Sequence, residues 1–277
     1  MIFFRQKGWL TLAKNFFTAV LILFTMTFTG CGDTSENAAE TNNGKALIIG
    51  FDEFAPMGFT DESGNVVGFD VDLAKEAAKR LGVEIEFKPI EWNNKEAELR
   101  SGNINIIWNG LDITPEGQQS MIFSKPYMDN RQILLVKKGN PKEIRALSNL
   151  AGKIVATQAG SYSETYIDEN TDLRNTFAKF KTYRNIGEGF AGLSKGEFDV
   201  LIIDEIAARY EISKSPDKFE IVDVTVGPIT EFGIGFRKNN SKLRDKVQKV
   251  FDDMIADGTA KKISEQWFGA NLIRRRD

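Results

Sequence analysis

The 277-residue sequence contains no histidine and only one cysteine. The lack of histidine excludes Ser-His-Asp and Cys-His nucleophilic sites, as well as metal sites that need imidazole. A single cysteine excludes an intramolecular disulfide and a zinc-cysteine cluster. Chemistry is therefore left to carboxylates, lysine, tyrosine, serine, threonine and the backbone.

An excess of positive charge is also missing. Lysine and arginine number 36 against 39 aspartate and glutamate residues, which gives a net charge of −3 at pH 7. Because nucleic-acid-binding proteins carry a basic patch or stripe and none stands out here, we expect no nucleic-acid partner and favour a small solute. With 42% hydrophobic and 27% charged residues, the composition is that of a globular protein with one large or two modest domains.

The N-terminal segment has the pattern of an export signal. Its positive charges are Arg5, Lys7 and Lys14. An uncharged apolar run follows over residues 16–28, too short to span a bilayer comfortably. It ends in Phe-Thr-Gly-Cys at 28–31, which resembles the lipobox of bacterial lipoproteins, although phenylalanine stands where leucine is usual. The pattern predicts a lipoprotein signal peptide over residues 1–30 and lipid attachment at Cys31; the alternative is a secretion signal followed by a chance cysteine.

Residues 31–45 are predicted to be the lipidated cysteine and a flexible tether. Positions 32–45 contain alanine as their only apolar residue type, and such a segment cannot bury enough surface to offset the entropy of ordering. Removing 30 residues from 277 leaves 247, and the loss of three cations takes the net charge from −3 to −6. We expect an exported, acidic protein, held at the outer face of the cell membrane or in the periplasm by the lipid on Cys31.

From residue 46 onward, short apolar runs alternate with helical patterns, which predicts βαβ units on parallel sheets. One helix is especially well marked, because Asp70 is a suitable N-cap, apolar residues recur on one face through Leu81, and Gly82 follows as a stop. The expected strands are 46–51, 83–90, 104–109, 153–158, 177–183, 198–203 and 219–224. The expected helices are 70–81, 92–101, 185–195, 241–257 and 259–268, with two more that begin at Ser161 and Asp204.

Two further apolar runs, at 132–138 and 232–238, are expected to be crossover strands that carry the chain from one lobe to the other and back. They predict a first lobe made of 46–134 and 235–270 and a second lobe over 139–228. In a two-lobed α/β protein, the ligand binds in the cleft where the carboxyl ends of strands from both lobes meet.

The strand ends carry two long motifs, VGFDVDLA at 67–74 and WNGLDITPE at 108–116. In this order they resemble the polar amino acid-binding proteins of ABC importers, a solute-binding family with the periplasmic-binding-protein type II fold. The resemblance runs from Leu47 to Phe268. It implies a two-lobed α/β fold, a monomer that binds an amino acid or cationic solute, a membrane permease as partner, no cofactor and no enzymatic activity.

The resemblance also implies roles for single residues. Asp204 matches the carboxylate that accepts the α-ammonium of the ligand, with a helix N-cap as the alternative. Phe54 and Trp92 match the aromatic walls around the ligand side chain, and core packing is the alternative for Trp92. Asn109 and Gly110 match positions that offer polar and main-chain groups to the ligand.

On the second lobe, Ser161 begins a capping box whose helix N-terminus can receive a carboxylate, with plain capping as the alternative. Gln158 is expected to face the cleft beside it. Two positions depart from the family pattern: Gly117 stands where an arginine usually grips the ligand carboxylate, and Asp112 stands where threonine or serine is common. Both make the expected carboxylate pocket less positive.

The departures leave the ligand open. Either another cation replaces the arginine, for which Arg131 and Arg184 are possible, or the ligand is not a standard amino acid. Four carboxylates near one cleft would suit a basic amino acid, a derivative without a carboxylate, or a polyamine; they are Asp52, Glu53, Asp112 and Asp204. The alternative for Asp52 and Asp112 is that they cap loops.

Two other functions remain as alternatives. Some relatives of this fold resemble cyclohexadienyl dehydratases, in which case Glu53 or Asp112 would need a raised pKa and a nearby donor. A sensory ligand-binding module is the other possibility, and it would need a separate signalling partner.

Overall fold

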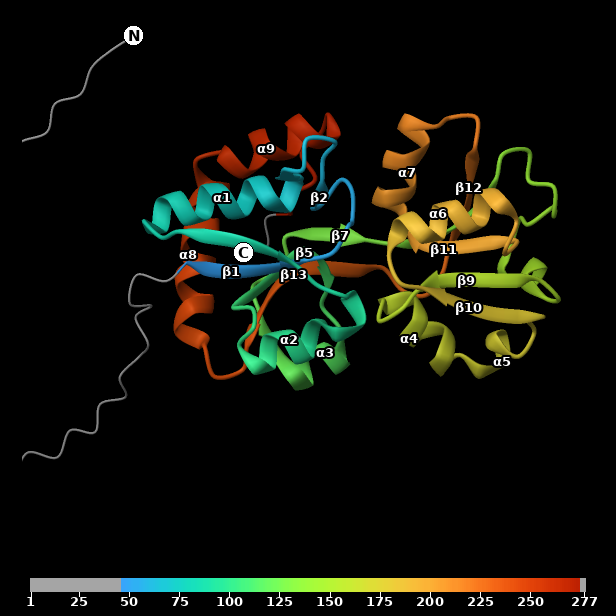
Figure 1. Cartoon of the computed structure of the whole chain (residues 1–277), viewed down its shortest axis with the longest axis horizontal. Helices are drawn as coiled ribbons and strands as arrows, with labels where there is room; N and C mark the ends of the chain where they lie inside the picture. The colour runs from blue at the N-terminus through green and yellow to red at the C-terminus, as the bar shows by residue number, and fades with distance from the viewer. Residues whose placement is uncertain (1–45, 275–277) are drawn as a thin grey trace, which may run out of the picture. The chain divides into compact units, whose positions relative to one another are not determined.

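The computed structural model describes residues 46–274 (Figure 1). The predicted signal peptide over 1–30, the predicted lipidation at Cys31 and the tether to residue 45 lie outside the described residues. Within the described residues, no helix combines the length and apolar character that a bilayer crossing requires.

The first lobe is built on a mixed sheet in the order β4-β1-β5-β13-β6, with β7 paired to β13. Its strands are β1 (Leu47–Phe51), β4 (Ile85–Pro89), β5 (Ile106–Asp112), β6 (Met121–Phe123), β7 (Met128–Asn130) and β13 (Thr230–Arg237). Strand β1 is parallel to both β4 and β5, whereas β13 runs antiparallel to β5. The connections from β1 and β5 therefore diverge, and the ends of these strands form a switch point where α/β proteins bind ligands.

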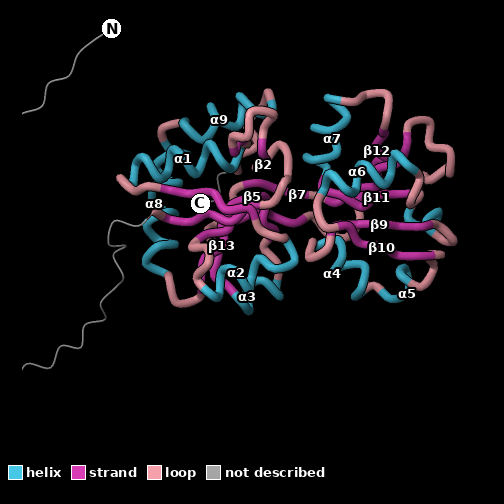
Figure 2. The backbone as a smooth tube through the Cα atoms, viewed as in Figure 1, coloured by secondary structure: helices cyan, strands magenta, loops and turns pink. Residues whose placement is uncertain are grey.

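Helices cover both faces of this sheet (Figures 1 and 2). On one face lie α1 (Phe69–Leu81), α8 (Ser241–Ala256) and α9 (Thr259–Phe268); on the other lie η1 (Trp92–Asn94), α2 (Lys95–Ser101) and α3 (Pro115–Ser120). A short hairpin of β2 (Phe59–Thr60) and β3 (Val66–Val67) precedes α1.

The second lobe repeats this plan with the strand order β10-β9-β11-β8-β12. Its strands are β8 (Gln132–Lys137), β9 (Ile154–Gln158), β10 (Lys179–Tyr183), β11 (Val200–Asp204) and β12 (Phe219–Thr225). Its helices are η2 (Leu147–Leu150), α4 (Tyr162–Glu169), α5 (Thr171–Arg174), α6 (Ile186–Lys195) and α7 (Glu205–Lys214). Figure 1 shows α6 and α7 on one face of the sheet and α4 and α5 on the other. The two-lobed α/β fold expected from the sequence is confirmed.

The predicted lobe limits at 134 and 235 differ from the structure, because both fall inside strands. Strand β8 lies wholly in the second sheet and β13 wholly in the first, and only Arg131 separates β7 from β8. Both faces of β8 are buried, with Leu134 in one apolar cluster and Ile133 in another. A strand buried on both faces is apolar throughout, so its sequence does not indicate which sheet it joins.

The N-cap prediction for Asp70 is wrong. Helix α1 begins at Phe69 after Gly68, whose φ of 141° and closeness to the Met57 carbonyl suit only glycine. The N–H groups of Phe69 and Asp70 donate to the carbonyls of Pro56 and Met57, so the preceding loop already satisfies the start of the helix. The side chain of Asp70 is instead fully buried in the lobe.

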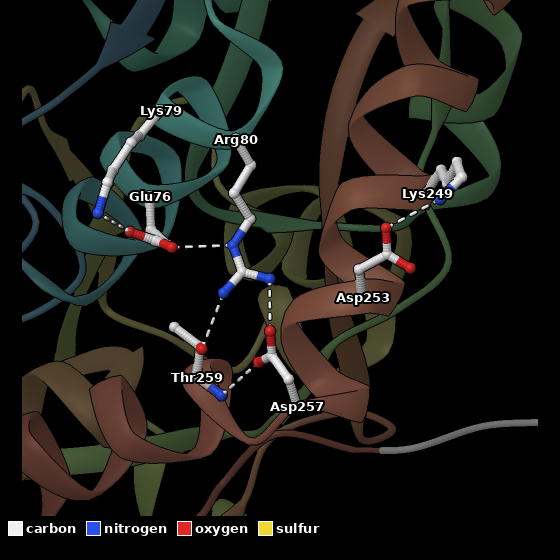
Figure 3. A network of polar contacts seen from close by, with 7 residues as sticks. All are labelled: Glu76, Lys79, Arg80, Lys249, Asp253, Asp257 and Thr259. Carbon is white, nitrogen blue, oxygen red and sulfur yellow. Dashed lines mark hydrogen bonds and ion pairs between the residues drawn. The ribbon is translucent and has the colours of Figure 1, made fainter.

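The C-terminal helices are joined to α1 through Arg80 (Figure 3). Its Nε donates to Glu76 Oε1 at 2.8 Å, Nη1 to Asp257 Oδ2 at 2.6 Å and Nη2 to Thr259 Oγ1 at 2.8 Å. Asp257 and Thr259 flank the turn between α8 and α9. The network therefore fixes the last two helices on the first lobe, which the chain re-enters after completing the second.

Candidate ligand-binding site

A pocket between the lobes is lined by all eight residues that the sequence analysis proposed for ligand binding, together with Asp52. They are Phe54, Trp92, Asn109, Gly110, Asp112, Gln158, Ser161 and Asp204. The sheet topology brings them together, because β1, β5, β9 and β11 all end at this pocket. The eight proposed residues therefore form one continuous lining.

The lobes touch across this pocket. Gln158 Nε2 donates to Asp52 Oδ2 at 2.6 Å, and Lys95 Nζ donates to the Gly160 carbonyl at 2.7 Å. A Cβ atom on Gly160 would lie 2.5 Å from the Cα of Asn93 on the other lobe, so only glycine permits this approach. The enclosed space is about 20 Å³, which is enough for about one water molecule. A ligand must therefore enter by separation of the lobes.

Two half-buried carboxylates, Asp112 and Asp204, share one donor. Asn130 Nδ2 donates to Asp112 Oδ1 at 3.0 Å and to Asp204 Oδ1 at 2.5 Å. Thr230 also donates to Asp112, and Gln132 donates to Asp204. Burial raises the pKa of both carboxyls, and the neighbouring charge of Asp204 raises that of Asp112 further. Their hydrogen-bond donors are neutral, and the charge of Lys95 lowers the pKa of Asp112 only in part. Further positive charge beside the pair would therefore be favourable.

Asp204 stands at the N-cap position of α7, yet its side chain makes no capping hydrogen bond. It accepts from Gln132 Nε2 at 2.6 Å instead. Ser163 Oγ donates to Gln132 Oε1 at 2.7 Å. This bond orients the Gln132 amide so that its nitrogen faces Asp204. The Asp204 carboxylate is thus held in the cleft rather than used by its own helix.

Asp52 adds a third carboxylate to the pocket. It accepts from Gln158 and from the Glu53 N–H, and burial raises its pKa to about 6. Glu53 has a different place: its carboxylate accepts from the N–H and hydroxyl of Thr60 in an exposed position, and it does not line the pocket.

The aromatic walls combine pocket lining with core packing. Phe54 is buried, packs edge-on against Phe232 with ring centres 6.4 Å apart, and lies so close to Gly110 that a Cβ there would come within 2.2 Å of its ring. Trp92 is buried in a cluster that includes Leu99. Trp92 therefore packs in the core and also lines the pocket.

Asn109 and Gly110 have much of their hydrogen-bonding capacity engaged within the protein. The amide of Asn109 accepts from the Asp52 N–H at 2.9 Å and donates to the Gly58 carbonyl. The Gly110 N–H donates to the buried carboxyl of Asp70 at 2.7 Å. These two residues shape the wall of the pocket, and these side-chain and N–H donors are not free for a ligand.

Ser161 caps α4 as predicted. Its Oγ accepts from the Glu164 N–H at 3.2 Å. In a capping box, the Glu164 side chain would accept from the N–H of Ser161 itself. Here Glu164 Oε2 accepts from the N–H of the preceding residue, Gly160. The N-terminus of α4 consequently opens on the pocket beside Ser161.

Gly117 lies on a neighbouring cavity of about 430 Å³. This cavity shares Trp92, Asp112 and Ser161 with the pocket and is also lined by Lys95. We refer to it as the Gly117 cavity.

Neither arginine considered as a substitute cation lines the pocket or the Gly117 cavity. Arg131 is paired with Glu205 at 2.6 Å and with Asp223 at 2.9 Å. Arg184 is paired with Glu188 at 3.2 Å on the surface. Among residues 46–274, no group of acidic or cysteine side chains is arranged to hold a metal ion.

The model of the family "Bacterial extracellular solute-binding proteins, family 3" matches residues 47–270. The chain belongs to this family. The resemblance to solute-binding proteins seen in the sequence is therefore confirmed. The expectation of a binding protein rather than an enzyme is confirmed as well, because the relatives are binding proteins.

Three relatives of this solute-binding protein illustrate the range of ligands. The arginine-binding extracellular protein ArtP of Bacillus subtilis is 32% identical, covering 95% of this chain and 98% of the relative. The L-cystine-binding protein TcyJ of Escherichia coli is 31% identical, covering 82% and 84%. A substrate-binding protein of an ABC uptake transporter from Streptococcus pneumoniae, solved with bound histidine, is 32% identical with a TM-score of 0.79, covering 83% and 95%.

Four residues around the site of this solute-binding protein escaped the sequence analysis: Lys95, Asn130, Gln132 and Thr230. Asn130 and Gln132 belong to a polar stretch, DNRQ at 129–132, that directly precedes an apolar run. That interruption could have indicated a turn into the cleft. Lys95 gave no such signal, since it stands in a charged helical segment that is typical of a solvated face.

Proposed function

We propose that this protein is the extracytoplasmic receptor of an ABC importer and that it binds a free amino acid, preferably a basic one, between its lobes. The observation that carries the proposal is the half-buried pair of Asp112 and Asp204, whose hydrogen-bond donors are neutral. An α-ammonium placed against them supplies positive charge and offsets their desolvation. One relative was solved with bound histidine, and two others are named as arginine-binding and L-cystine-binding proteins; all three ligands are α-amino acids, which supports the same class.

A preference for basic amino acids follows from the third carboxylate. The Asp112 and Asp204 pair is sufficient for one α-ammonium, whereas Asp52 remains for a second cation. Phe54 and Trp92 flank the same space and suit the aliphatic part of a long cationic side chain. The arginine-binding relative ArtP is consistent with this preference.

The anchoring and delivery steps belong to the same proposal. Lipid on Cys31 and the tether over 31–45 would hold the receptor, a monomer, at the outer membrane face or in the periplasm, within reach of a membrane permease. Closure of the lobes around the amino acid would create the form that the permease accepts.

The test is calorimetric titration of the full-length protein, purified in detergent, with the twenty amino acids, their decarboxylated amines and common polyamines. Basic amino acids should bind with a Kd near micromolar or tighter, about −8 kcal/mol, and neutral amino acids more weakly. A protein that binds none of these compounds would overturn the proposed function.

A further inference from the structure

The Gly117 cavity is lined by a half-buried ammonium group. Lys95, the first residue of α2, donates from Nζ to the Gly160 carbonyl at 2.7 Å and to the Trp92 carbonyl at 3.4 Å. The ammonium lies 5.1 Å from the centre of the Trp92 ring. Burial lowers the pKa of Lys95. Within residues 46–274, no ion pair joins this lysine, in contrast to Arg131 and Arg184.

The hydrogen bonds of Lys95 leave capacity for another partner. An ammonium group has three N–H donors, and the structure gives two carbonyl acceptors. Both acceptors are neutral carbonyls, and a half-buried ammonium is stabilised further when an anionic oxygen accepts from its remaining N–H. Lys95 is therefore equipped to receive one anionic oxygen from the cavity.

The space beside Lys95 is large enough for part of a ligand. The cavity of about 430 Å³ falls within the range of small-molecule sites, whereas the adjoining pocket encloses only about 20 Å³. Trp92, Asp112 and Ser161 line both spaces, so the two spaces adjoin. An anion in the cavity would meet Lys95 on the first lobe and Ser161, with the N-terminus of α4, on the second.

We propose that Lys95 is the cation that binds the carboxylate of the ligand, and that the space left by Gly117 receives this carboxylate. The inference rests on the proposed amino acid-binding function and names the group that replaces the family arginine. Asp112 and Lys95 also line the same cavity, as negative and positive groups that match the two charges of a zwitterion.

The cavity also has other charges near Lys95. Glu116 and Arg100 are exposed, so solvent screens their charges, whereas Glu96 is half-buried, as Lys95 is. The charges of Glu96, Asp112 and Glu164 raise the pKa of Lys95 and partly offset the effect of burial. Lys95 also bonds the Gly160 carbonyl across the cleft, which means that the ammonium that holds the carboxylate also joins the two lobes.

The experiment compares each basic amino acid with its decarboxylated amine: arginine with agmatine, lysine with cadaverine and histidine with histamine. The full-length protein and its Lys95→Gln and Lys95→Arg variants are titrated with the pair that the unaltered protein binds most tightly. Lys79→Gln is the control, because this lysine is 80% exposed and also loses one positive charge. Circular dichroism of each variant establishes that it is folded.

The unaltered protein should prefer the amino acid over its amine. Lys95→Gln should weaken amino acid binding by about tenfold or more and change amine binding by less than about threefold. Lys95→Arg should retain most of the preference. Equal losses for amino acid and amine would make Lys95 a contact between lobes only and would overturn the inference, as would an unchanged preference. If the unaltered protein binds amines but no amino acid, the carboxylate role fails; if it binds neither, the proposed function itself fails.

Discussion

The proposed site has two parts that differ in how they are built. At its ammonium end, Asp112 and Asp204 are held by the shared amide of Asn130. Its carboxylate end is the Gly117 cavity, which has Lys95 on its wall and which Asp112 also lines. The first end is complete before a ligand arrives, because side chains from both lobes already fix the two carboxylates. The second end is spacious, and its cation is tied to backbone carbonyls. Under the proposed function, we expect the ammonium to provide most of the affinity and the carboxylate end to set which ligands are preferred.

The largest expected effect is at the ammonium end. Asp204→Asn preserves the size of the side chain and removes its charge, so the ligand ammonium loses its main partner. Affinity for the best amino acid and for its amine should both fall by about a hundredfold or more, as measured by calorimetric titration. Asp217→Asn is the matched control, because Asp217 is an exposed residue of the same lobe. If Asp204→Asn binds normally, the assignment of the two ends is wrong.

The dependence on pH should also separate the two ends. Burial raises the pKa of Asp112 and Asp204 in the empty site, and a bound cation lowers it again. Binding therefore releases protons, and affinity should rise by up to about tenfold per pH unit as the solution goes from mildly acidic to neutral. Titrations in two buffers of different ionisation enthalpy would measure the protons released.

In the alkaline range, the carboxylate end should respond to pH. Burial lowers the pKa of Lys95, so this residue loses its charge at a lower pH than an ordinary lysine does. The amino acid should then lose affinity through Lys95, whereas the amine should not lose affinity through that residue. An amino acid affinity that is constant from acidic to neutral pH would contradict the role given to the carboxylate pair.

The next effect is a rescue at the carboxylate end. In the Lys95→Gln background, Gly117→Arg should restore about tenfold of amino acid affinity, because a guanidinium can grip a carboxylate with two hydrogen bonds. A Cβ at position 117 would lie 3.1 Å from the Phe123 ring and 3.2 Å from Thr114 Oγ1, so these neighbours must shift slightly. Gly117→Ala in the same background controls for that crowding. A double variant no better than the alanine control would show that the cavity is not the carboxylate site.

The smallest expected effect comes from a change in the closure of the two lobes, which should alter the affinity for amino acid and amine equally. Gly160→Ala would place its Cβ 2.5 Å from Asn93 Cα and hold the lobes apart. Affinity for amino acid and amine should fall together, by about tenfold or less, because a smaller fraction of the protein can close. Gly139→Ala is the matched control, since its φ of 79° resembles the 73° of Gly160 and nothing lies within 4 Å of the added Cβ. Small-angle scattering with saturating ligand would measure closure in both variants.

Much of the fold could be predicted because strands and helices alternate with clear stops, as at Gly82 and Gly196, which both end helices in a left-handed conformation. The site could be predicted because the motifs stand at strand ends, where topology brings distant residues together. The failures have physical causes. Asp70 looked like an N-cap because a polar residue before an apolar stripe usually is one, but the loop backbone already satisfied the helix start.

Lys95 could not be found from the sequence, because the role proposed for it depends on a cavity that it lines together with Gly117, twenty-two positions later, and on a carbonyl from the other lobe. A residue whose partners all lie outside its own helix leaves no periodic signal. The lobe limits failed for a related reason, since hydrophobicity reports burial and not the identity of the neighbouring strand.

The single residue that separates β7 from β8 places Asp204 beside a connection between the lobes. Asn130 on one side of Arg131 and Gln132 on the other both donate to the same oxygen of Asp204. Under the proposed function, the ligand ammonium would neutralise a carboxylate that is bonded to both residues flanking this connection. A small rotation at a connection between two bodies becomes a larger displacement at their far ends, so the charge state of Asp204 would affect the relative position of surfaces that lie far from it.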